Sequence, residues 1–122
     1  MFASVEISKH GIFVAALDFD WYMNIFELRK LADTLPSQGG KEIGLWLERH
    51  ATWVPEGSCI IELGSWLGAG TAFLALGSMK SGAPIHVWDR WICASEEEQQ
   101  KAKAQGVDLK LGEDTLPKVK EV

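Results

Sequence analysis

The sequence predicts an α/β fold with parallel strands, because two short apolar runs enclose a glycine-rich turn and a helix-like segment. The first run covers residues 59–63 and the second covers residues 84–89. Each carries a carboxylate near its end, Glu62 in the first and Asp89 in the second. Strand, turn, helix and strand in this order are typical of α/β proteins, which bind ligands at the carboxyl ends of parallel strands. We therefore expect Glu62 and Asp89 beside a ligand site at one edge of a sheet.

Length and composition indicate one ordinary globular domain. The chain has 122 residues, of which 47% are hydrophobic and 24% are charged, so it is long enough to bury a core. Its formal net charge is −5, and its Lys and Arg residues are mostly scattered. Binding to a nucleic-acid backbone needs clustered positive charge. The composition therefore argues against a nucleic-acid partner.

Cysteine usage and hydropathy predict a cytoplasmic protein. Cys59 and Cys93 have neither the number nor the spacing of a disulfide framework or a metal site. Cys59 lies inside the first apolar run and is expected to be a buried, reduced thiol. No apolar run is long enough to span a membrane, and the N-terminal residues lack the pattern of a signal peptide. We expect neither a bound metal nor a membrane partner.

Two interpretations fit residues 1–17. Apolar residues on both sides of Ser8-Lys9-His10-Gly11 indicate a possible β-hairpin, with Gly11 supplying the permissive backbone. An extended arm that packs on the core or on a partner fits equally well. Apolar residues at three- and four-residue steps then predict a helix from Asp18 to Leu35, capped by Asp18 or Asp20. The turn residues of 36–40 end it.

A second helix is predicted from Lys41 to Trp53. Its inner side is expected to carry Ile43, Trp46, Leu47, His50 and Ala51. Residues 54–58 contain Pro and Gly, which break the helix and lead into the first apolar run.

The C-terminal part is predicted to be polar and helical. Ser95 and Glu98 form a capping-box pattern at the start of a helix that runs to about Gln105 and is closed by Gly106. A last helical segment starts at Asp114 or Thr115. The chain is thus expected to be a single partial domain in three parts: an N-terminal arm and helix (1–40), a motif-bearing core (41–91) and polar C-terminal helices (92–122).

The glycine spacing separates several classes of ligand site. A phosphate-binding P-loop needs a lysine after its last glycine, and residues 59–79 contain no lysine. A dinucleotide-binding turn needs Gly-x-Gly-x-x-Gly or Ala. The best match begins at Gly68 and places Phe73 where close packing of helix on strand requires a very small residue. NAD and FAD therefore fit poorly.

The spacing that does fit is acidic-x-Gly-x-x-x-Gly-x-Gly, formed by Glu62, Gly64, Gly68 and Gly70. It resembles the first motif of class I S-adenosylmethionine-dependent methyltransferases. The phrase Ile61-Glu62-Leu63-Gly64-Ser65-Trp66-Leu67-Gly68 looks most like a subgroup of small-molecule O-methyltransferases. Members of that subgroup carry a bulky residue in place of the usual middle glycine, as Trp66 does here. The resemblance covers about residues 41–91.

The resemblance implies a truncated Rossmann-like half-fold and a set of cofactor contacts. The strand-end acid, Glu62 here, approaches the methionine amine of S-adenosylmethionine, and Asp89 matches the acid that accepts hydrogen bonds from the ribose hydroxyls. The expected cofactor-binding residues are Glu62, Gly64, Ser65, Gly68, Gly70, Thr71, Asp89 and Trp91. The chemistry agrees, because this cofactor has an ammonium and a ribose diol but no phosphate, so its site needs carboxylate acceptors rather than lysines.

The resemblance also implies methyl transfer to a hydroxyl of a small molecule, although the sequence indicates no catalytic base. Complete enzymes of this class have a larger sheet, so we expect a homo-oligomer or a missing C-terminal half. Three alternatives stay open: a non-catalytic interaction module, a different nucleotide-binding enzyme, and a glycine turn without a ligand. Trp66, Trp88 and Trp91 could flank an adenine ring or fill the core, and core packing is favoured for Trp88.

Overall fold

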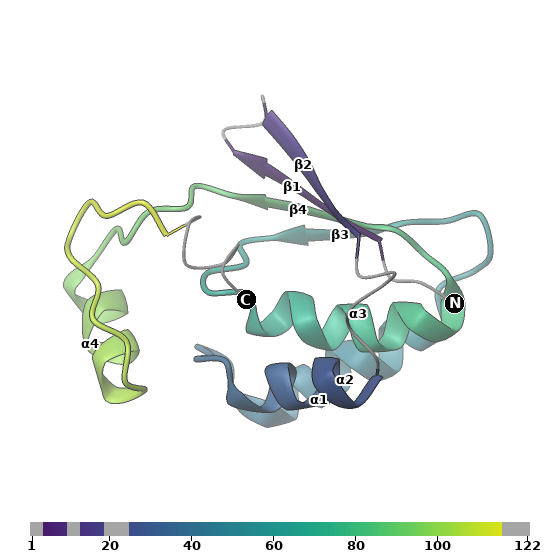
Figure 1. The fold of residues 1–122 in the computed structure, drawn as a ribbon, viewed down its shortest axis with the longest axis horizontal. Helices are drawn as coiled ribbons and strands as arrows, with labels where there is room; N and C mark the ends of the chain where they lie inside the picture. Colours follow the sequence, from purple (N-terminus) through teal and green to yellow (C-terminus); the bar gives the residue numbers. More distant parts are fainter. Residues whose placement is uncertain (1–3, 10–12, 19–24, 116–122) are drawn as a thin grey trace.

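The computed structural model describes residues 4–9, 13–18 and 25–115, with side chains described from residue 25 onward, and it has an α/β fold (Figure 1). In chain order its elements are β1 (Ser4–Lys9), β2 (Phe13–Asp18), α1 (Ile25–Thr34), α2 (Gly40–Thr52), β3 (Ile60–Leu63), α3 (Ala69–Ser81), β4 (Ile85–Asp89) and α4 (Glu96–Ala104).

The described strands form one mixed sheet in the order β2-β1-β4-β3. The two predicted apolar runs are the parallel neighbours β3 and β4, with Ile60 opposite Ile85. The predicted hairpin is confirmed, because β1 and β2 pair antiparallel from Ser4–Asp18 to Lys9–Phe13. The hairpin is also part of the sheet, since β1 pairs in parallel with β4. The alternative of an extended arm is therefore wrong.

The predicted helix start at Asp18 is wrong. Asp18 is the last residue of β2, where it pairs with Ser4, so it cannot cap α1. The apolar run Phe13–Leu17 extends the hairpin up to this point, and strand pairing takes precedence over the helical spacing that begins there. Within the described residues α1 starts at Ile25, and the other proposed cap, Asp20, lies outside them.

Helix α3 lies between the sheet and the other core helices. In Figure 1 it runs directly along one face of the sheet, with α1 and α2 beyond it. Its residues Thr71–Ser78 are all buried, as expected for a helix that is covered on several sides. It packs with Leu28 of α1, Ala51 of α2 and Ile85 and Val87 of β4 in one apolar cluster. This cluster anchors β3 and β4, whose ends carry the predicted site.

Close contact between α2 and α3 decides which side of α2 is buried. A Cβ atom built on Gly77 would lie 2.2 Å from the Glu48 carbonyl oxygen, and one built on Gly44 would lie 2.3 Å from the Phe73 ring. The helices approach so closely that a side chain at either place would force its neighbours to shift. The predicted inner side is therefore wrong in part. Gly44 and Ala51 are buried and Leu47 packs partly inward, whereas Ile43, Trp46 and His50 are exposed.

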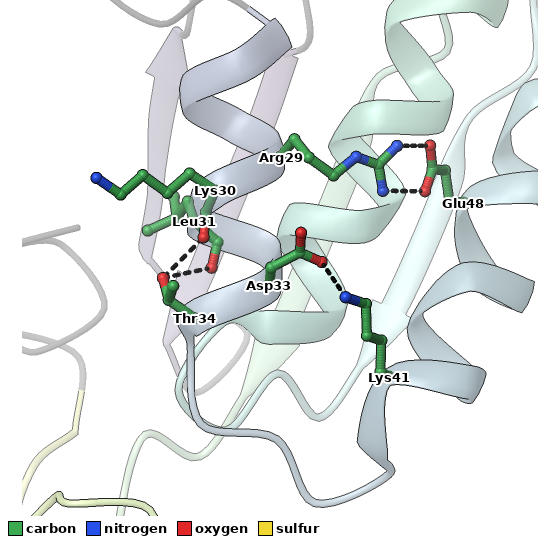
Figure 2. Close-up of polar contacts among 7 residues, drawn as sticks. All are labelled: Arg29, Lys30, Leu31, Asp33, Thr34, Lys41 and Glu48. Atoms are coloured by element: carbon green, nitrogen blue, oxygen red, sulfur yellow. Dashed lines mark hydrogen bonds and ion pairs between the residues drawn. The ribbon is translucent and has the colours of Figure 1, made fainter.

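Polar contacts hold α1 against α2. Figure 2 shows Arg29 of α1 donating two hydrogen bonds to the carboxylate of Glu48 on α2, one of them 2.7 Å long. The hydrogen bond from Arg29 to Glu48 raises the pKa of the guanidinium above its ordinary value. Asp33 and Lys41 form a second ion pair of 3.2 Å at the same junction. Together they fix the connection between the two helices, residues 35–39.

The C-terminal segment forms a second, smaller cluster. Ala102 of α4 packs with Leu67, Cys93 and Leu109, and Trp66 lies against them. The predicted cap is confirmed at Ser95, whose Oγ accepts a hydrogen bond from Glu98 N, while the Glu98 carboxylate accepts one from Ala94 N. The predicted helix start at Asp114 or Thr115 is wrong, because Asp114 forms a β-bridge with Ile92 and Thr115 N donates a hydrogen bond to Trp91 O. The residues after Thr115 lie outside the described ones.

The far face of β3 and β4 is uncovered in the described part of the chain. Ile61, Leu63 and Trp88 are 63%, 80% and 42% exposed, and α1, α2 and α3 all lie on the other face (Figure 1). The prediction that Trp88 packs in the core is therefore wrong. Cys59, expected to be buried, is a free and exposed thiol just before β3.

Candidate functional site

The turn between β3 and α3 has an unusual backbone. Gly64, Trp66 and Gly68 have φ angles of +84°, +54° and +94°, in the left-handed region that favours glycine. A tryptophan in this region is strained and is held by its surroundings. This geometry turns the chain sharply out of β3, so that α3 begins at Ala69 without a side-chain cap. The first residues of α3, Ala69 and Gly70, line a cavity.

The carboxylate of Asp89 accepts hydrogen bonds from backbone amides of the turn. Its Oδ2 accepts hydrogen bonds from Ser65 N at 2.5 Å and Trp66 N at 2.8 Å, and its Oδ1 accepts one from Trp91 N at 2.8 Å. Successive amides in such a turn form a concave site for an anion, and here Asp89 is that anion. One further acceptor position on Oδ1 remains for a ligand hydroxyl. Binding of a ribose by Asp89 stays a prediction. In the structure the same carboxylate holds the turn through the hydrogen bonds that it accepts from the backbone amides.

Glu62 lies beneath the turn in a largely buried network of hydroxyl groups. Thr71 Oγ1 donates a short hydrogen bond to Glu62 Oε1, and Thr71 Oγ1 lies 2.7 Å from Ser65 Oγ. Burial raises the pKa of Glu62 to about 7, against the opposing effect of hydrogen bonds from Thr71 and Ser65, and the charge of Asp89 raises it further. A cation bound beside Glu62 would favour the ionised form and reverse this shift.

A cavity of about 670 Å³ opens beside these two acids, within the size range of small-molecule sites. Its floor is formed by the turn, the start of α3 and the end of β4. The α1–α2 connection and the first turns of α2 form one wall, and Ile92, Glu98 and Thr115 form the other. Three acidic residues line it, Glu62, Asp89 and Glu98. Among the described lining residues the basic side chain is that of Arg90. The cavity is therefore suited to a ligand with positive charge.

The structure brings most of the predicted site residues to the cavity. Glu62, Gly64, Ser65, Gly70 and Asp89 line it. The other three predicted residues, Gly68, Thr71 and Trp91, are not among the described residues that line the cavity. Gly68 shapes the turn, Thr71 bonds to Glu62 behind the lining, and the Trp91 ring is 1% exposed within the main core cluster. Of the three tryptophans considered for an adenine ring, Trp66 and Trp88 line the cavity.

The wall formed by residues 36–40 was missed by the sequence analysis. Its proline, serine and glycines were interpreted only as the end of a helix, although loops that join rigid elements often carry binding residues. Ile92, Glu98 and Thr115 were missed as well. Their distance from the glycine turn in the sequence gives no local signal. Backbone contacts of residues 112–115 with residues 91–93, together with the packing of α4 on Leu67, bring these residues to the site.

In residues 25–115 and the two described strands before them, no three side chains of His, Cys, Asp or Glu are grouped so that they could hold a metal ion. The helices of this same part are too short or too polar to cross a membrane. Comparison with protein-family models, with curated proteins and with solved structures gave no match.

Proposed function

We propose that this protein binds S-adenosylmethionine through Glu62, the glycine turn and Asp89. The observation that carries the proposal is the pair of strand-end carboxylates that line a cavity of about 670 Å³. S-adenosylmethionine has a sulfonium, an ammonium, a carboxylate and a ribose diol. Acidic lining residues match the cationic groups, and the uncapped start of α3 offers backbone amides and a partial positive charge to the carboxylate.

Glu62 is the partner proposed for the ammonium. The pKa of its carboxyl group is about 7, so a large share of the Glu62 side chains is protonated at neutral pH. An ammonium within hydrogen-bond distance stabilises the carboxylate and gives a charge-assisted hydrogen bond, worth roughly 1.5–3 kcal/mol. Ser65 and Thr71 hold the carboxylate at the end of β3, so it is positioned before the ligand arrives.

The activity proposed for this site is methyl transfer to the hydroxyl of a small molecule. Class I methyltransferases carry such a site on a Rossmann-like sheet, and β3, α3 and β4 form a parallel βαβ unit with the motif at its first turn. The proposal includes a half-fold of this class and a reducing, cytoplasmic setting, which suits the free thiols of Cys59 and Cys93. No catalytic base is assigned.

Among the described strands β3 lies at the edge of the sheet, and this edge supports a second candidate function, an assembly module derived from such an enzyme. Ile60 N donates to Pro84 O, just before β4, and Gly64 N donates to Trp88 O of β4. The alternating amides of Ile61 and Leu63 therefore point away from the sheet. Their side chains are apolar and exposed. An edge without Lys, Pro or a bulge is open to pairing with another strand. We propose that a second copy, or a C-terminal half that continues the sheet, covers it.

Calorimetric titration with S-adenosylmethionine, S-adenosylhomocysteine and NAD tests the main proposal. We expect both sulfur nucleosides to bind and NAD not to bind. Glu62→Gln, which keeps the size of the side chain, should weaken binding by roughly 10-fold or more, and Asp108→Asn, an exposed acid outside the cavity lining, is the matched control. Absence of heat with all three ligands would favour the assembly module. Binding of NAD alone would favour a different nucleotide-binding enzyme.

A further inference from the structure

Two walls of the cavity come from segments far apart in the sequence. Residues 36–40 stand on one side, carried by α1 and α2, and Glu98 of α4 stands on the other. Figure 1 shows α4 set apart from the layer of α1, α2 and α3. Its apolar contacts are with Leu67 and the segment that follows β4, so the position of α4 relative to residues 36–40 needs a separate explanation.

A pair of hydrogen bonds joins these walls at their outer ends. Ser37 N donates to Gln105 Oε1 at 2.7 Å, and Gln105 Nε2 donates to Ser37 O at 2.9 Å. The same Nε2 donates to Lys101 O at 3.2 Å, which ties the amide to the last turn of α4. Because one side-chain amide satisfies both backbone groups of Ser37, the contact is specific for glutamine or asparagine chemistry.

The 36–40 wall is a compact turn. Gly40 N donates to Ser37 Oγ at 3.0 Å, which closes the segment into a compact turn, and Gly40 has a left-handed φ of +79°. The hydrogen bonds to Gln105 are exposed to solvent. Exposed hydrogen bonds exchange readily with water and contribute modestly to stability. The contact therefore adds only modestly to stability.

We propose that Gln105 is a latch that holds the 36–40 wall across the cavity and so controls uptake and release of the ligand. Gln105 touches neither Glu62 nor Asp89 and acts through the position of Ser37. The identity of the ligand rests on the proposed function, but the latch itself does not.

Thiol labelling tests the latch without a ligand. Thr115→Cys places a small thiol at a cavity position that is 2% exposed, while Cys59 is an exposed reference and Cys93 reports the packing beneath α4. We expect Gln105→Ala to raise the labelling rate at position 115 by about three- to tenfold, with the Cys59 and Cys93 rates unchanged. Gln105→Glu keeps the acceptor for Ser37 N and loses the donor to Ser37 O. Its labelling rate at position 115 should lie between the rates of the unchanged Gln105 protein and of Gln105→Ala.

Gln100→Ala, an exposed glutamine on the same helix, is the control. Equal rates at position 115 in Gln105→Ala and Gln100→Ala would overturn the proposal. A parallel rise at Cys93 would also overturn it, because α4 would then have come away from its cluster. Stopped-flow binding of S-adenosylhomocysteine gives the second measurement. Both its association and dissociation rate constants should rise in Gln105→Ala, with the equilibrium constant changed less than about twofold. If the wild-type protein binds no nucleoside, the proposed function fails and the labelling still decides the latch.

Discussion

The carboxylate of Asp89, at the end of β4, accepts a hydrogen bond of 2.5 Å from the backbone amide of Ser65, in the turn that follows β3. A second bond from Trp66 N, also to Oδ2, completes the contact. The predicted ligand-binding acid therefore also joins the two parallel strands at their carboxyl ends. Any substitution of Asp89 changes the shape of the site together with its charge, so loss of binding in Asp89→Ala would not by itself identify a ligand contact.

Asp89→Ala should destabilise the fold by about 2–4 kcal/mol, because the amides of Ser65, Trp66 and Trp91 lose their acceptor. Asp89→Asn keeps one oxygen and should cost about half as much. Urea unfolding followed by circular dichroism measures both, with Asp108→Asn as the control. An unfolding free energy of Asp89→Ala within about 0.5 kcal/mol of wild type would show that these hydrogen bonds do not hold the turn.

Glu62→Gln should make stability less dependent on pH. The pKa of Glu62 is about 7 in the folded protein, above its ordinary value of 4.5, so the unfolded chain loses this proton first as the pH rises. The wild-type unfolding free energy therefore falls between pH 4.5 and pH 7 through this group, by at most about 3 kcal/mol. Between pH 4 and pH 8, the unfolding free energy of Glu62→Gln should therefore rise by that amount relative to that of the wild type, as measured by urea unfolding. A difference that is the same at both pH values would contradict the shift.

Affinity for S-adenosylhomocysteine should rise with pH between 6 and 8. An ammonium pairs with the ionised form of Glu62, and this form becomes the major one only above the pKa of about 7. Below that pKa the affinity should fall, by up to about tenfold per pH unit. Titration calorimetry at several pH values checks this. In Glu62→Gln the profile should be flat, and a variant that keeps the wild-type slope would assign the pH dependence to another group.

Gly77→Ala should destabilise the protein more than Gly44→Ala. The new methyl group at position 77 meets the Glu48 carbonyl oxygen and Ala51, which belong to the backbone and core of α2, whereas at position 44 it meets the ring of Phe73. A ring can turn away, but a helix backbone must shift. We expect a loss of about 2–3 kcal/mol for Gly77→Ala and about 1 kcal/mol for Gly44→Ala. Thermal unfolding of both variants ranks their stabilities. If Gly44→Ala were the less stable one, the tight contact between α2 and α3 would not lie at Gly77.

Ile61→Pro should abolish pairing at the edge of β3. The Ile61 amide points away from β4, as the bonds from Ile60 N and Gly64 N show, so proline removes an edge donor without breaking the β3–β4 ladder. Light scattering should show wild-type self-association at micromolar concentration and a dissociation constant at least about tenfold higher in the variant. Leu111→Lys, at an exposed leucine far along the chain, is the control. A monomeric wild-type protein would rule out a second copy as the covering partner.

Local patterns were enough to predict most elements of the fold. The runs that became β3 and β4, the glycine turn and the cap at Ser95 each depend on residues close together in the sequence. Long-range contacts explain the failures. The buried side of α2 depends on Gly44 and Gly77, where two helices meet, and hydrophobic spacing within α2 placed Trp46 inside although it is exposed.

The sequence predicted the two acids of the candidate site and part of its glycine turn. Glu62 and Asp89 were found because a strand end is a local feature, and parallel pairing brings the two ends together. The wall at Ser37 and the latch at Gln105 depend on a contact between segments that share no local pattern. The hydrogen bonds that the turn amides donate to Asp89 depend on the φ angles of Gly64 and Trp66, and residue spacing does not reveal such an angle for a tryptophan.

The position of β1 also has a consequence for how the chain folds. β1 begins at Ser4, yet its parallel partner is β4, with Val5 opposite Ile85. The hairpin of β1 and β2 can form as soon as it is synthesised, but it cannot join the sheet until β3, α3 and β4 exist. Such non-local pairing is slow, and a two-stranded hairpin alone is marginally stable. Folding of this protein should therefore proceed from the β3–α3–β4 unit, with the first strands of the sequence added last.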